Sequence, residues 1–210
     1  MIHIGLDMYL TAQRFINGGY SHVRNDYIRE EGKPVHIDPK AVLPPEAKMF
    51  DKIISALGFG SFATFSKKYP ESNSITVSVS VAYWRKANAI HQWFVANVQE
   101  GVDDCREYEV SRDQLRELLD VVTELLKHVD KGEPVKERDF FGNEYDSYPN
   151  LTMDVDAAKA SLPTQQGFFF GSTNYDEWYV HDLEITRDQL TQILEDKKLA
   201  GFYFNYRSSW

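Results

Sequence analysis

Four stretches of the chain alternate apolar and polar positions in the way that half-buried β-strands do. The clearest is ITVSVSVAYW (75–84), where a β-branched residue occupies every second position at its start. The same alternation is found in IHIGLDMYL (2–10), REYEV (106–110) and GFYFNYRSSW (201–210). These four stretches predict the strands of a sheet.

Other stretches repeat their apolar residues every three or four positions, as amphipathic helices do. This spacing predicts helices over 47–58, 111–129 and 186–196. The second and third of these begin with Ser or Thr followed three residues later by Gln, which is a capping box. We also predict a helix of about four turns over YWRKANAIHQWFVANV (83–98).

Two apolar stretches near the third helix predict further strands. QGFFFGS (166–172) predicts a strand and a turn, and EWYVHDLEI (177–185) predicts a strand. An internal similarity accompanies the second, because EVSRDQLRELL (109–119) and EITRDQLTQIL (184–194) match closely. Each would be a strand that leads through a cap into a helix. Their flanking residues do not match, so we favour local convergence over a duplication.

Together the elements predict an α+β fold, in which about three to four helices pack on one face of a mainly antiparallel sheet. The length of 210 residues suggests a single domain over 1–210. Two segments show neither the alternation of a strand nor the three-to-four-residue spacing of a helix, and both are rich in polar residues, Gly and Pro. We expect a long irregular insertion over 11–46, with at most a short hairpin, and a loop-rich connection over 131–165.

Charge and composition restrict the class of protein. The chain has 32 acidic and 23 basic residues, a net charge of −9, which opposes general binding to nucleic acids or anionic membranes. It permits a local basic pocket, or an acidic surface that fits a partner's basic groove. The one cysteine, Cys105, fits a reducing compartment. We see no signal peptide and no membrane-length apolar run, and we expect a cytoplasmic protein.

The 83–98 stretch carries more polar and aromatic residues than a core helix needs. On a helix Trp84, Asn88 and His91 share a stripe, and Arg85 lies beside it. Arg85 would hold a carboxylate or phosphate, Trp84 would stack on a planar group, and His91 would donate a hydrogen bond or carry a proton. The alternative is a half-buried helix in which Asn88 and His91 bond to neighbouring loops.

A second candidate for the same site is FFFGSTNYDEWY (168–179), where small and polar residues follow an apolar stretch. Such turns present backbone N–H groups and hydroxyls at a strand end, where ligands often bind. The alternative is an ordinary tight turn. If it is a site, we expect one concave patch formed with the 83–98 helix, to which the turn contributes Ser172, Thr173, Tyr175, Asp176 and Trp178.

Reactive chemistry is only weakly indicated. Cys105 with His91 could form a nucleophile and base, and Asp103 with Asp104 could bind a cation. The two acids should raise the pKa of the thiol, so we do not expect Cys105 to be a nucleophile. No zinc, phosphate-loop or dinucleotide motif occurs, and we expect no metal and no cofactor. An enzyme would draw its reactive groups from His91, Asp103, Cys105, Asp176 and Glu177.

Several stretches resemble a family of small bacteriophage and prophage proteins whose activity is not established. They are GLDMYL (5–10), YWRKANAIHQWFV (83–95), DDCREYEVS (103–111), GFFFGSTNYDEWY (167–179) and SSW (208–210). The resemblance implies an accessory phage or prophage protein in the host cytoplasm, rather than a central metabolic enzyme.

With that setting, we expect a protein that binds a small anionic or nucleotide-like molecule and thereby counters host defence signalling. One alternative is an acidic protein that blocks a host macromolecule, such as a host protein, through its surface. A second alternative is a small hydrolase that acts on a nucleotide-like substrate.

Overall fold

The computed structural model describes residues 5–18, 28–30, 33–35, 47–59 and 74–210. They form an α+β fold with a four-stranded antiparallel sheet in the order β4-β1-β10-β5. Its strands are β1 (Asp7–Asn17), β4 (Ser74–Arg85), β5 (Tyr108–Val110) and β10 (Tyr203–Ser209). The four alternating stretches therefore predicted the strands of this sheet, although residues 2–4 lie outside the described part.

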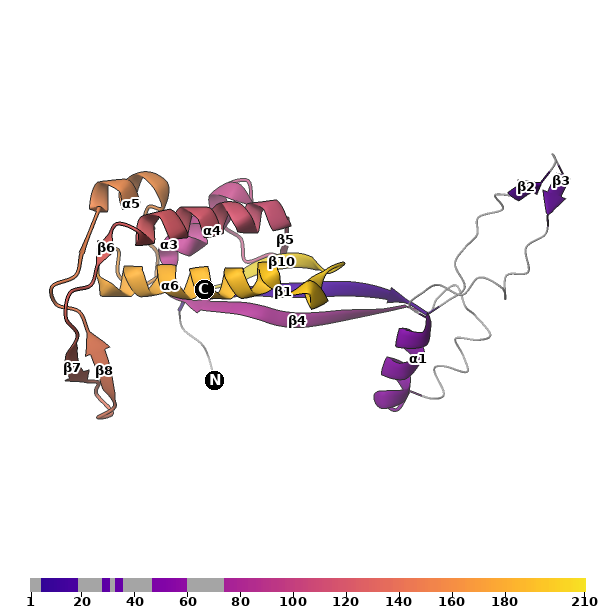
Figure 1. The fold of residues 1–210 in the computed structure, drawn as a ribbon, viewed down its shortest axis with the longest axis horizontal. Coiled ribbons are helices and arrows are strands. Elements are labelled where there is room, and N and C mark those ends of the chain that lie inside the picture. Colours follow the sequence, from indigo (N-terminus) through magenta and orange to yellow (C-terminus); the bar gives the residue numbers. More distant parts are fainter. Residues whose placement is uncertain (1–4, 19–27, 31–32, 36–46, 60–73) are drawn as a thin grey trace. The chain divides into compact units, whose positions relative to one another are not determined.

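The helices are α1 (Ala47–Ala56), α3 (Asn88–Asn97), α4 (Arg112–Leu126), α5 (Val155–Ser161) and α6 (Glu177–Glu195), followed by a 3-10 turn η3 (Lys197–Leu199). In Figure 1, α3, α4 and α6 lie on one side of the sheet. The main core joins Met8 and Leu10 of β1 to Leu118 of α4 and Leu183 of α6. This confirms the predicted α+β class.

Contacts divide the chain into two compact units, one of Met1–Ala12 with Val79–Trp210 and the other of Gln13–Ser78. The first unit contains the main core. The second has a small core of its own, made by Ile16, Phe50 and Ile54. β1 and β4 contribute residues to both units, and the single domain over 1–210 stays a prediction.

The insertion predicted over 11–46 begins later than expected. β1 continues to Asn17, because Ala12 and Ile16 continue the burial of one strand face. A short hairpin of β2 (Ile28–Glu30) and β3 (Lys33–Val35) follows, as the prediction allowed. The other residues of the insertion, 19–27, 31–32 and 36–46, lie outside the described part of the chain.

The connection predicted as loop-rich over 131–165 contains regular structure. β6 (Val129–Asp130) pairs with β9 (Thr152–Met153), β7 (Val135–Arg138) pairs with β8 (Glu144–Ser147), and α5 follows. Ion pairs join Lys136 to Asp146 and Arg138 to Glu144 across the β7–β8 hairpin. All of β7 is exposed, so the hairpin has no apolar alternation from which it could be predicted.

The strand predicted over 177–185 is wrong, because this stretch is the first half of α6. Its buried residues recur at helical spacing, as in Tyr179, Leu183 and Thr186. The signal that was missed lies one residue earlier. The carboxylate of Asp176 accepts hydrogen bonds from the backbone N–H groups of Trp178 and Tyr179 and caps the helix.

The two matching sequences have different structures. Ser111 is the N-cap of α4, and both hydrogen bonds of its capping box with Gln114 are formed. Thr186, its counterpart, lies inside α6, and its hydroxyl donates to the carbonyl oxygen of Asp182. Only the first of the two matching sequences therefore forms a strand–cap–helix unit, which argues against a structural duplication.

The strand predicted over 166–172 is also absent. Phe169 has φ 63° and Gly171 has φ 97°, and such left-handed backbone cannot continue a strand. The backbone of this segment instead bonds to other parts of the chain. The carbonyl of Phe169 accepts from the N–H of Leu6, and the amide of Asn88 binds the carbonyls of Phe170 and Ser172.

Candidate functional site

The junction between β4 and α3 decides where the expected site residues lie. β4 runs to Arg85, Lys86 has φ 60°, and α3 begins only at Asn88. The helix predicted over 83–98 is therefore shorter at its start. Neighbouring side chains on a strand point to opposite faces, so Trp84 enters the core while Arg85 reaches solvent.

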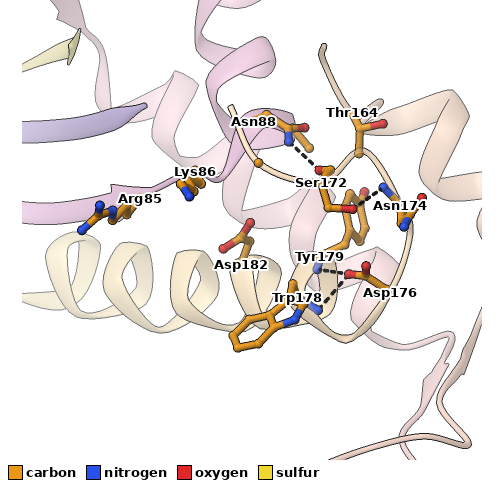
Figure 2. A pocket seen from close by; sticks show the side chains of 12 residues that line it. Arg85, Lys86, Asn88, Thr164, Ser172, Asn174, Asp176, Trp178, Tyr179 and Asp182 are labelled. Carbon is orange, nitrogen blue, oxygen red and sulfur yellow. Dashed lines mark hydrogen bonds between the residues drawn. The ribbon is translucent and has the colours of Figure 1, made fainter. Parts of the chain in front are cut away.

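A cavity of about 370 Å³ lies among the end of β4, the start of α3 and the first turns of α6 (Figure 2). Five of the nine expected binding residues line it: Arg85, Asn88, Ser172, Asp176 and Trp178. The remaining lining residues were not predicted: Lys86, Ala89, Thr164, Gly171, Asn174, Tyr179 and Asp182.

Trp84 does not line the cavity, which corrects its expected role in stacking on a ligand. Its side chain is buried, and its indole N–H donates to the hydroxyl of Thr186 at 2.9 Å. Its ring also packs against Phe94 within the core. Trp84 therefore joins β4 to α6 and α3.

His91 is also placed elsewhere: its side chain is fully buried and belongs to a polar network that reaches the surface at Asp103 and Trp210. Its Nδ1 lies 2.8 Å from the hydroxyl oxygen of Tyr206, and its Nε2 lies 3.0 Å from a carboxylate oxygen of Asp103. The other oxygen of Asp103 accepts from the indole N–H of Trp210 at 3.0 Å. Both ring nitrogens of His91 are engaged, so neither is left to act as a base for Cys105.

Asn88 lines the cavity and also holds its wall. Its Nδ2 donates to the carbonyl oxygens of Phe170 at 3.2 Å and Ser172 at 2.7 Å, and its Oδ1 accepts from the N–H of Gln165 at 3.0 Å. Asn88 therefore bonds to a neighbouring loop, as the alternative interpretation of the sequence expected. The loop it holds is the expected 171–178 side of the cavity.

Thr173 and Tyr175 do not line the cavity, but both form hydrogen bonds with Thr164, which does. The hydroxyl of Thr164 donates to the carbonyl of Thr173 at 3.1 Å, and its N–H donates to the hydroxyl of Tyr175 at 3.2 Å. Both contacts hold Thr164, which is itself a lining residue. Ser172 accepts from the N–H of Asn174 at 3.1 Å within the same turn.

The acids proposed as reactive groups each stabilise local structure. Asp176 caps α6, and Glu177 accepts from the N–H of Tyr148 at 2.9 Å. Asp103 binds His91, whereas Asp104 binds Arg106, so each of the two acids has its own partner. Among the described residues, no group of three or more His, Cys, Asp or Glu side chains is arranged to hold a metal ion.

Arg85 and Lys86 are the cations of the cavity. Both side chains are exposed, and neither has a carboxylate within 4.0 Å among the residues that the structure describes. Figure 2 shows them at one end of the cavity and Trp178 with Asp176 toward the other. Gly171 lets the loop approach them closely, since a Cβ there would lie 3.0 Å from the carbonyl oxygen of Lys86.

Asp182 lies between the two ends of the cavity (Figure 2). Burial and, to a smaller extent, the nearby carboxylate of Asp176 together raise the pKa of its carboxyl to about 7. Sequence reasoning missed Asp182 because it assigned 177–185 to a strand. On a helix, residues 178 and 182 share a face, and the two side chains would have been expected together.

Replacing Asp182 by Asn is expected to stabilise the protein in a pH-dependent way. The native pKa of about 7 exceeds the ordinary value of 3.8. Between these two pH values the native protein therefore holds a proton that the unfolded protein releases. Stability is therefore lost as the pH rises through this range. Urea unfolding should show no gain for Asp182→Asn at pH 4 and a gain of about 2–4 kcal/mol at pH 8. An equal gain at both pH values would contradict this account of Asp182.

Comparison with known proteins supplies no relative. No protein-family model matches the chain, and neither a curated protein nor a solved structure matches it. Within the described ranges, no helix combines the length and the apolar character needed to cross a membrane.

Proposed function

We propose that this protein binds a small anionic, nucleotide-like molecule in the cavity lined by Arg85, Lys86 and Trp178. The observation that carries the proposal is the position of Arg85 and Lys86, two consecutive exposed cations that face a concave cavity and have no ion-pair partner among the described residues. A guanidinium and an ammonium that line the same cavity suit a phosphate or carboxylate group.

The rest of the cavity suits the remainder of such a molecule. Trp178 is 59 % exposed and offers an aromatic face for a planar ring. Ser172, Asn174 and Thr164 offer hydroxyl and amide groups for hydrogen bonds. The raised pKa of Asp182 makes its carboxyl partly protonated near neutral pH, which reduces its repulsion of an anion.

The resemblance to phage and prophage proteins supplies the biological part of the proposal. An accessory phage protein in the host cytoplasm would use this cavity to sequester a host signalling nucleotide and so counter defence signalling. Binding alone accounts for this role. The candidate acids Asp103, Asp176 and Glu177 hold local structure, which favours sequestration over the hydrolase alternative.

The proposal is tested by what the purified protein carries. After gentle purification and denaturation, mass spectrometry of the released small molecules should find a phosphorus-containing compound, present in proportion to the protein. The Arg85→Gln variant purified in parallel should carry much less. A compound retained equally by both proteins would contradict binding through Arg85.

A further inference from the structure

A second hollow, of about 200 Å³, shares Trp178 with the first cavity and lies between α6 and the stretch from β8 to Leu151. We call it the aromatic hollow. Four aromatic residues are among those that line it, Tyr145, Tyr148, Trp178 and His181. The hydrogen bond from the N–H of Tyr148 to Glu177 fixes the segment against the start of α6.

The charges around the aromatic hollow are mainly negative. Three carboxylates line it, those of Asp146, Glu177 and Glu184, together with the ammonium of Lys131. Asp146 pairs with Lys136 and Glu184 with Lys131, so Glu177 is the one of the three without an ion pair among the described residues. Rings present negative faces, and carboxylates beside them add to the same potential. The aromatic hollow therefore favours a cation, whereas the Arg85 end of the first cavity favours an anion.

The protein itself already places an alkylammonium group here. The Nζ of Lys131 lies 4.7 Å from the ring centroid of Tyr148 and 2.7 Å from a carboxylate oxygen of Glu184. This contact combines a cation–π interaction with an ion pair. Lys131 is itself partly exposed and lies at a wall of the remaining space, so a second cation could compete with it.

We propose that the aromatic hollow binds a methylated ammonium group, carried by a small molecule of the choline type or by a methylated lysine side chain. Methyl groups fill the space between the rings, and the spread positive charge faces both rings and carboxylates. A strongly hydrated ion would lose its water at greater cost among these rings.

The test compares choline with 3,3-dimethyl-1-butanol, which has the same shape without the charge. Titration calorimetry should show choline binding roughly tenfold more tightly than the alcohol, as expected for a cation among aromatic rings. Acetylated trimethyllysine amide, titrated in parallel, distinguishes the two sources of the group by which probe binds more tightly. Equal binding of choline and the alcohol, or no binding of either cation, would overturn the proposal.

Variants assign the binding to this hollow. Tyr148→Leu keeps an apolar side chain and removes the ring, and should weaken choline binding several-fold. Tyr203→Leu is the matched control, because Tyr203 is 40 % exposed on β10 and does not line the hollow. Lys131→Gln removes the competing ammonium and should strengthen binding. Unchanged affinity in Tyr148→Leu would overturn the proposal.

The anion-binding proposal and the methylated ammonium proposal can be tested independently of each other. Trp178 lines both spaces, but Tyr148 and Lys131 line only the aromatic hollow of the two. Substitutions at Tyr148 and Lys131 therefore test the methylated ammonium site whether or not a nucleotide-like molecule binds at Arg85.

Discussion

Replacing Asn88 by Ala should lower the free energy of unfolding by about 2–4 kcal/mol, because three backbone groups lose their partner at once. The buried amide of Asn88 binds the carbonyls of Phe170 and Ser172 and the N–H of Gln165. In a chain of this length the melting temperature should fall by roughly 4–16 °C. Urea unfolding and calorimetry measure both quantities.

Asn97→Ala is the matched control on the same helix. Asn97 is exposed, and its amide donates only to the carbonyl of Trp93 one turn earlier. Alanine also has the higher helix propensity, so this variant should change stability by less than about 1 kcal/mol. Equal losses in the two variants would show that Asn88 does not hold the 165–172 loop.

The double substitution of Arg85 and Lys86 by Gln should weaken the binding of adenosine 5′-monophosphate by at least about a hundred-fold. Each charge-assisted contact to the phosphate contributes roughly 1.5–3 kcal/mol, and both would be lost. Both side chains are exposed and have no ion pair among the described residues, so the melting temperature should change little.

The matched control replaces Lys197 and Lys198 by Gln. These are also two consecutive exposed cations, but they lie in η3 and do not line the cavity. The control changes the net charge by the same amount, so it separates a local contact from a general electrostatic effect. A comparable loss of binding in both double variants would show that net charge, not the cavity, attracts the anion.

Much of the fold could be predicted because its signals are local. The burial of alternate positions in β1 and the capping box at Ser111 are both visible in the sequence itself. The start of α6 was missed since EWYVHDLEI is rich in strand formers, and packing of Tyr179 and Leu183 against the core outweighs that preference. The β7–β8 hairpin was missed because all of β7 is exposed and offers no apolar pattern.

The candidate site was only partly predictable for a related reason. Arg85 and Asn88 were identified from their residue types, but their neighbour Trp84 was assigned to the same wall. The strand continues through Arg85, so Trp84 and Arg85 point to opposite faces, and only the left-handed backbone at Lys86 ends it. No local sequence pattern indicates that the strand ends there rather than before Trp84. Asp182 joins the site only through the helical geometry of α6.

The affinity of the unmodified protein for adenosine 5′-monophosphate, measured beside that for adenosine, tests the anion site most directly. The two molecules share the ring that would stack on Trp178 and differ in the group that would meet Arg85 and Lys86. We expect the monophosphate to bind at least about a hundred-fold more tightly, a difference that the Arg85→Gln, Lys86→Gln variant abolishes. Equal affinities for the two molecules, unchanged in that variant, would contradict an anion-binding cavity.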